Sequence, residues 1–283
     1  MSSEPDWAPK PGEYVRRSRR RSPSALGQAR GPWTAGEQAR FEDTGVTWES
    51  FEVNTIGPSS VERSRHRFRA HLPELIWNTA ALEGNNFTLP EVKTLLEGVT
   101  VGGKKLEDAE QIIALSEAYS ELDEMVGAGR FSLSKEVSDE LHHLVARHEA
   151  IEAGLFRGEG KVQGGGTVRL ASGGVVPGTE HGEGGALLRE HFINLVDYLQ
   201  TVSDPRRRAL IYFASAVRRQ FYFDGNKRTA RLMMTGELMS GGYDIVSVPY
   251  SRKLEFNYAL DILFDRDDAT ELLRFLSTCT LPE

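Results

Sequence analysis

Residues 220–231 read Gln220-Phe-Tyr-Phe-Asp-Gly-Asn-Lys-Arg-Thr-Ala-Arg231 and separate two segments with helical apolar periodicity. The upstream segment begins at Asp204-Pro205, an N-cap residue followed by proline in the first turn. The downstream segment keeps an apolar face until Gly241-Gly242, which ends the helix. The sequence therefore predicts a tight turn at Asp224-Gly225-Asn226 between two buried helices.

This turn has the features of an anion site. A glycine-containing turn that runs into a helix exposes backbone N–H groups at the positive end of the helix dipole, which favours phosphate. Arg228 and Arg231 are three residues apart, so both guanidinium groups are expected to point from one helix face toward the same anion. The Asp224 carboxylate beside these cations is best explained as a ligand for Mg²⁺ that bridges phosphates.

The same residues resemble the signature of the Fic family, His-x-Phe-x-Asp/Glu-Gly-Asn-Gly/Lys-Arg-x-x-Arg. Gln220 stands at the position of the signature histidine, and Tyr222 at that of the phenylalanine. In the family, the histidine deprotonates a hydroxyl on a target protein, which then attacks the α-phosphate of ATP. The Gln220 amide does not ionise and cannot act as a general base. The positions that match outright are Asp224, Gly225, Asn226, Arg228 and Arg231.

The resemblance implies a site for ATP with Mg²⁺ and a fold to hold it. Gln220 and Arg228 take the catalytic positions, and Asp224 takes that of the metal ligand. The implied fold is mostly α, a Fic-like helical bundle around a central helix with a small β-hairpin flap. The ATP-binding positions are Gly225, Asn226, Lys227, Arg228 and Arg231.

A second motif lies upstream of this core. Apolar residues at helical spacing predict a helix from His71 to Leu82 that closes at Glu83-Gly84-Asn85. The run Thr79-Ala-Ala-Leu-Glu83 resembles the inhibitory motif Ser/Thr-x-x-x-Glu of one class of Fic proteins, whose glutamate pairs with the second signature arginine. By this resemblance Thr79 and Glu83 are inhibitory residues, and Glu83 is expected to form an ion pair with Arg231. Without the resemblance, Glu83 is simply a solvated acid at a helix end.

A glycine-rich run from Gly158 to Gly185 alternates with valines and a leucine, which predicts one β-hairpin with long flexible ends. Gly154-Leu-Phe-Arg157, just before it, resembles the Gly-x-Phe/Tyr-Arg segment that opens the substrate-facing part of many Fic proteins. In the family such a flap clamps the target protein by β-augmentation. The alternative is a mobile loop, because glycine also suits disorder.

Two other patterns resemble ligand sites but lack a required feature. Residues 98–104 match the first seven positions of a P-loop, but Lys105 replaces the hydroxyl that binds Mg²⁺, and a helix replaces the preceding strand. This segment is therefore predicted to be a turn between helices. Three histidines lack the spacing of four that a zinc-binding helix needs, which favours a structural or surface role for His142, His143 and His148.

Periodicity and caps predict about eight helices around one buried central helix, in a single core domain from about Glu62 to Thr280. We divide the chain into an N-terminal extension (1–61), whose first 40 or so residues are expected to be disordered, an inhibitory helix region (62–100) and a Fic core (101–283). A brief strand is expected over 243–248. The remaining helices are expected over 88–96, 106–126, 134–151, 187–199, 251–264 and 268–279.

Composition limits the classes of partner. The chain has 283 residues with a net charge of -7, which argues against general nucleic-acid binding; the exception is the basic cluster Arg16–Arg21. Neither a signal peptide nor an apolar run of the ~18 residues that cross a membrane is visible. A single cysteine, Cys279, fits a reducing cytoplasm, so we expect a cytoplasmic protein. Its expected partner is a protein target docking at the flap, and a homo-oligomer is left open.

Three functions fit these features. The first is a protein adenylyltransferase held closed by Glu83, with catalysis impaired or altered by Gln220. The second is a pseudoenzyme or regulatory module that keeps the nucleotide site. The third is a phosphotransferase like the Doc toxins, suggested by Lys227, because that branch also carries Asn-Lys-Arg.

Overall fold

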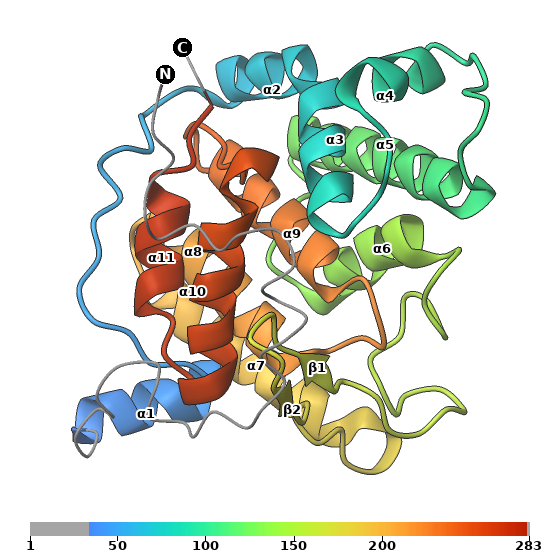
Figure 1. The fold of residues 1–283 in the computed structure, drawn as a ribbon. Coiled ribbons are helices and arrows are strands. Elements are labelled where there is room, and N and C mark those ends of the chain that lie inside the picture. The colour runs from blue at the N-terminus through green and yellow to red at the C-terminus, as the bar shows by residue number, and fades with distance from the viewer. Residues whose placement is uncertain (1–33, 282–283) are drawn as a thin grey trace, which may run out of the picture.

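The structure, a computed structural model that describes residues 34–281, is mostly helical, with eleven α-helices in that range and one two-stranded sheet (Figure 1). Helix α9 (Asn226–Ser240) lies at the centre, and thirteen of its 15 residues are buried. Helix α8 (Pro205–Arg219) packs against it and is capped at its start by the Asp204 carboxylate, as predicted. The turn that connects α8 to α9 is therefore held between two packed helices.

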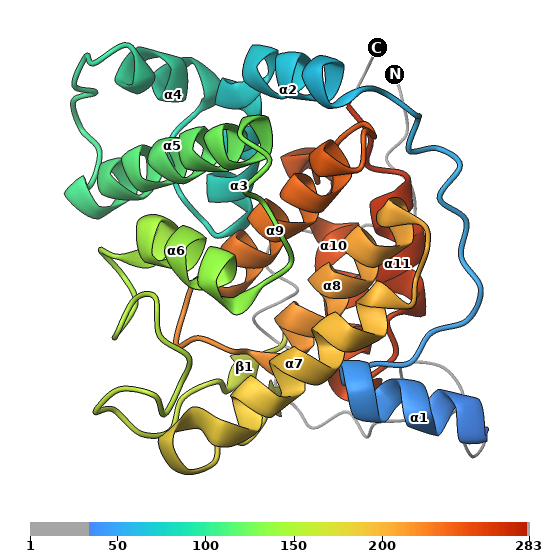
Figure 2. The same cartoon turned by 180° about the vertical axis from the view of Figure 1, so that it is seen from behind.

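Two groups of helices surround this central pair (Figure 2). In the first group, α7 (Ala186–Gln200), α10 (Lys253–Arg266) and α11 (Thr270–Ser277) pack against α8, and α1 (Ala35–Thr44) packs against α7. In the second group, α2 (Val61–Ala70), α5 (Leu106–Gly127) and α6 (Lys135–Ala146) pack against α9, while α3 (Leu72–Leu82) and α4 (Leu89–Leu96) pack against α5.

The mostly α fold is confirmed, and nearly all predicted helices agree with the structure to within two residues at each end. The capping box of Thr88 and Glu91 is present, and residues 98–104 lie in the loop between α4 and α5, as predicted. One helix is shorter than predicted, because α6 ends at Ala146 rather than near Ile151. Beyond that point the chain turns so that Glu149 reaches Arg228, a distant partner that local periodicity does not reveal.

Two other predictions were wrong. Residues 243–248 form isolated bridges with Pro58 and Thr280 instead of a strand, because no neighbouring segment runs alongside far enough to make a ladder. The tail expected up to about residue 40 already contains α1, which begins at Ala35 behind a capping box of Thr34 and Glu37. Helix α2 was not predicted either, and the Arg16–Arg21 cluster lies outside the described residues.

The segment between α1 and α2 belongs to the main hydrophobic core. Val46, Phe51 and Ile56 are buried in the same cluster as the apolar residues of α8 and α9. The backbone of Thr47 exchanges hydrogen bonds with Asp267 and Ala269 beside α11. Residues before position 62 therefore contribute to the folding of the helical bundle.

The flap contains the only sheet in residues 34–281, in which β1 (Val168–Arg169) pairs antiparallel with β2 (Val175–Val176). The predicted hairpin is therefore present, with strands of two residues each. Its tip is held by Asp261 of α10, whose carboxylate accepts the backbone N–H groups of Ala171 at 3.0 Å and Ser172 at 2.8 Å. Within this same range of the chain, no helix has both the length and the apolar composition that crossing a membrane requires.

Candidate functional site

The turn between α8 and α9 is closed by the side chain of Asn226. Its Oδ1 accepts the Tyr222 N–H at 2.9 Å, and its Nδ2 donates to the Tyr222 carbonyl at 2.8 Å and to Gln220 Oε1 at 3.1 Å. Gly225 has a φ of 73°, and a Cβ there would lie 2.9 Å from the Ala146 methyl group. Glycine is required here because both the backbone angle and the packing against α6 exclude a side chain.

His142 of α6 packs against this turn and forms hydrogen bonds that hold it in place. Its Nδ1 accepts the Gly154 N–H at 2.8 Å, so the proton lies on Nε2, which donates to the Asp224 carbonyl at 2.8 Å. The ring also stacks on Tyr222, with 3.7 Å between centroids. Burial lowers the pKa of His142 to about 4, so the ring is neutral at pH 7. This is the structural role that the histidine spacing predicted, and no metal-binding cluster occurs among the residues described.

Acidification is expected to destabilise the fold through His142. The folded-state pKa of about 4 lies below the ordinary value of 6.5, so the unfolded chain binds the proton first and stability falls as the pH drops from 6.5 toward 4. A shift of this size corresponds to about 3 kcal/mol. Urea unfolding of the wild type and of His142→Gln between pH 7 and pH 4 should show a steeper loss for the wild type. Parallel curves for the two proteins would rule out this role.

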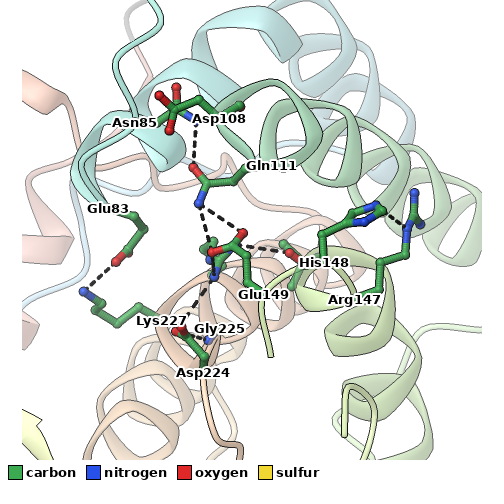
Figure 3. Close-up of polar contacts among 12 residues, drawn as sticks. Glu83, Asn85, Asp108, Gln111, Arg147, His148, Glu149, Asp224, Gly225 and Lys227 are labelled. Atoms are coloured by element: carbon green, nitrogen blue, oxygen red, sulfur yellow. Dashed lines mark hydrogen bonds and ion pairs between the residues drawn. The ribbon is translucent and has the colours of Figure 1, made fainter. Parts of the chain in front are cut away.

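Glu83, at the end of α3, pairs with two cations of α9. Its Oε1 accepts Arg231 Nη1 at 3.1 Å. Its Oε2 lies 2.7 Å from Lys227 Nζ, the contact drawn in Figure 3. The predicted ion pair with Arg231 is therefore confirmed. Burial by itself would raise the pKa of Glu83, but Lys227 and Arg231 outweigh it and lower the pKa to about 2. The carboxylate is charged at any physiological pH.

Arg231 retains capacity to bind an anion. Its side chain is only 6% exposed, yet its Nε and Nη2 find no hydrogen-bond acceptor within residues 34–281. The guanidinium also lies 5.4 Å from the centroid of the Phe256 ring. A buried guanidinium with two unsatisfied donors is costly unless a further acceptor reaches it, and phosphate oxygens suit that geometry.

Arg228 is held by an acid that the sequence analysis did not identify. Glu149 accepts both amino groups of Arg228, Nη1 at 2.6 Å and Nη2 at 3.0 Å, and the Val145 carbonyl accepts Nη1 at 3.2 Å. The Arg228 side chain is 3% exposed, and Asp224 Oδ1 lies 3.9 Å from its Nη2. Glu149 lies in the turn after α6 and belongs to no short motif, so only the three-dimensional structure reveals it.

Of the remaining predicted residues, Asp224 is exposed, whereas the side chains of Gln220 and Thr79 already have hydrogen-bond partners. The Asp224 side chain is 65% exposed and accepts one N–H, from Gly225 at 2.6 Å, which leaves oxygen lone pairs for a metal ion. The Gln220 amide donates to the Val217 carbonyl at 2.7 Å and accepts from Asn226, so it caps α8. The Thr79 hydroxyl bonds Tyr119 of α5 at 2.9 Å, which ties α3 to α5.

A cleft of about 540 Å³ opens over the turn. This volume lies within the range of small-molecule sites. Residues 220 and 224–228 contribute polar and cationic groups, and Leu82, Phe223, Leu260 and Phe264 contribute apolar surface. The flap covers one side with residues 167–171, and Glu83 also lines the cleft. Charged groups for phosphate, an exposed carboxylate for Mg²⁺ and an apolar wall are the components that a nucleotide with its metal ion needs.

Sequence comparison finds curated relatives, although no family model matches the chain. The protein adenylyltransferase Fic of Drosophila ananassae is 28% identical over 231 residues, which cover 81% of this chain and 44% of that protein. The protein of the same name from Aedes aegypti is 25% identical over 248 residues, which cover 86% and 46%. The chain thus spans less than half the length of these relatives.

Solved structures share the fold. Fic-1 of C. elegans superposes with a TM-score of 0.62 at 22% identity, covering 77% of this chain and 67% of that structure. A Fic domain containing signalling protein from Bacteroides thetaiotaomicron superposes with a TM-score of 0.61 at 22% identity, covering 86% and 91%. The curated relatives, the shared helical fold and the signature at residues 220–231 together support a Fic family protein.

Proposed function

We propose that the protein binds ATP with Mg²⁺ at the turn between α8 and α9 as a Fic-type adenylyltransferase, and that Glu83 keeps this site closed. The observation that supports this most strongly is the position of Glu83. Its carboxylate bridges Lys227 and Arg231, while two buried donors of Arg231 are left for a further acceptor. An acid placed on the cations of an anion site competes with the phosphate that the site would otherwise bind.

Each residue of the turn has a role in this proposal. The backbone N–H groups at the start of α9 and the Arg231 guanidinium would bind phosphate oxygens once Glu83 withdraws. Asp224 would hold Mg²⁺, which neutralises phosphate charge when bound. The flap, which lines the cleft, would align a segment of the target protein, and the lone cysteine fits a cytoplasmic location.

Catalysis in the wild type is expected to be slow. The Gln220 side chain cannot take a proton from the target hydroxyl, and both ends of its amide already have partners. This occupied amide also favours a second candidate, a nucleotide-binding regulatory module in which Gln220 is purely structural. Lys227, the residue that suggested phosphotransfer, is paired with Glu83 and would therefore stabilise the closed state of the site.

The proposal is tested by the affinity for ATP and Mg²⁺ with and without Glu83. Glu83→Gly is expected to tighten binding roughly tenfold, since couplings of this kind amount to about 1–3 kcal/mol. Because the pKa of Glu83 is about 2, the ratio of wild-type to variant affinity should stay constant from pH 5 to pH 8. Isothermal titration calorimetry measures both.

Asp224→Asn in the Glu83→Gly background is the control for the metal. It removes an exposed charge, so the fold should be unaffected, and it should abolish the dependence of ATP binding on Mg²⁺. If Glu83→Gly binds no ATP at millimolar concentration, the proposed function is wrong.

A further inference from the structure

Each signature arginine is paired with an acid from a different part of the chain. Arg231 is held by Glu83, which follows α3, and Arg228 is held by Glu149, which follows α6. The second pair is bidentate and leaves Arg228 nearly inaccessible. Both signature arginines are therefore paired with an acid at the same time.

The two acids are connected by hydrogen bonds. Gln111 of α5 donates from Nε2 to both carboxylate oxygens of Glu149, at 3.1 and 3.2 Å. The Oε1 of Gln111 accepts Asn85 Nδ2 at 2.9 Å, and Asn85 also donates to the Asp108 carbonyl at 2.9 Å (Figure 3). Asn85 lies two residues after Glu83, in the same turn. A relay therefore runs from the turn that carries Glu83 through Asn85 and Gln111 to Glu149.

We infer that Glu149 is a second acidic lock on the anion site, coupled to Glu83 through Asn85 and Gln111. This inference rests on the proposed function and adds a second element to its regulation. Any phosphate that binds Arg228 must displace Glu149 from its amino groups or share them. Withdrawal of Glu83 moves the turn that contains Asn85. Gln111 then loses its hydrogen bond with Asn85, and its hydrogen bonds to Glu149 weaken.

The alternative is that Glu149 only positions Arg228 for phosphate, and the two roles predict opposite effects. Glu149→Gln keeps the size of the side chain and removes its charge. A lock predicts tighter binding of ATP with Mg²⁺ in this variant, by roughly fivefold, because a competing anion is lost. A positioning residue predicts weaker binding, because the guanidinium loses its orientation.

The coupling is measured with a double-mutant cycle of Glu83→Gly and Glu149→Gln, with ATP and Mg²⁺ as the probe in calorimetry. Each single variant should bind more tightly than the wild type. The affinity of the double variant should increase by less than the product of the two single increases, because opening one lock already loosens the other. Glu117→Gln is the matched control. Glu117 lies on α5 and its carboxylate pairs with Arg147 at 2.5 Å, so this variant also removes one negative charge but leaves the contacts of the signature residues in place.

A second measurement needs no nucleotide. Hydrogen exchange at residues 83–88 should speed up severalfold in Glu149→Gln and in Gln111→Met, and should stay unchanged in Glu117→Gln. Gln111→Met leaves the pair of Glu149 and Arg228 in place, so it reports on the relay even if Glu149→Gln folds poorly.

Three results would overturn the inference. They are weaker ATP binding by Glu149→Gln, an increase in affinity in the double variant that equals the product of the two single increases, and a hydrogen-exchange rate at residues 83–88 that is unchanged in both Glu149→Gln and Gln111→Met. Failure of the proposed function looks different. In that case Glu83→Gly would not bind ATP at all, while the exchange measurement would still decide whether the relay exists.

Discussion

The Glu83→Gly, Gln220→His double variant is expected to transfer AMP to protein roughly 10² to 10⁴ times faster than Glu83→Gly alone, the range that a general base contributes. Histidine restores a group that accepts the proton of an attacking hydroxyl near pH 7. Position 220 lines the cleft beside the turn, so a base there faces the reaction space. Incorporation of label from α-labelled ATP into the protein itself or into lysate proteins measures the rate.

The backbone at residue 220 matters for this test. Gln220 adopts a left-handed conformation with φ 52°, which the hydrogen bonds of Asn226 and Arg157 hold in place. Gln220→Ala in the Glu83→Gly background is the control that removes the amide without adding a base. Robust transfer by the wild type, combined with an inactive Gln220→Ala variant, would show that the glutamine positions the nucleophile, and our assignment of a lost base would be wrong.

Arg157→Met is expected to destabilise the protein by roughly 3–5 kcal/mol, because it leaves several buried carbonyl groups without a donor. Arg157 is 1% exposed, and its guanidinium donates to the carbonyls of Gln220 at 2.6 Å, Thr179 at 2.7 Å and Gly165 at 3.0 Å. These bonds join both bases of the flap to the end of α8. Methionine keeps the aliphatic stem, so the loss reports on the hydrogen bonds rather than on a cavity.

Urea unfolding measures the change in free energy, and limited proteolysis shows whether the flap opens first. Arg274→Met is the matched control, since this arginine is 46% exposed and pairs only with surface acids and a carbonyl, so its loss should change stability by less than about 0.5 kcal/mol. Equal stability of Arg157→Met and Arg274→Met would mean that the flap is not held through Arg157.

Local patterns predicted the helices and the turn between α8 and α9 well, because caps, glycines and apolar periodicity act over a few residues. The same kind of signal was present at Thr34 and Glu37, whose capping box marks the start of α1, but the tail-like composition around it obscured the helix. The pairing of Glu83 with Arg231 spans 148 residues and was predicted only through a family resemblance.

The contacts that escaped prediction join residues that lie far apart along the chain. Glu149 meets Arg228 across 79 residues, and Arg157 reaches Gln220 across 63. No local spacing encodes such contacts, and a lone glutamate after a helix is usually a solvated charge. The bridges at residues 243–248 were mistaken for a strand for the same reason, since a strand is defined by a neighbour that the local sequence does not specify.

The flap is held at both ends although its strands have only two residues each. Arg157 anchors its base, and the Asp261 carboxylate anchors its tip. The conformational entropy of this glycine-rich segment is therefore lost when the protein folds rather than when a partner arrives. If a target peptide pairs with the flap as proposed, it loses only its own freedom, so we expect weak and sequence-tolerant backbone contacts to suffice for binding.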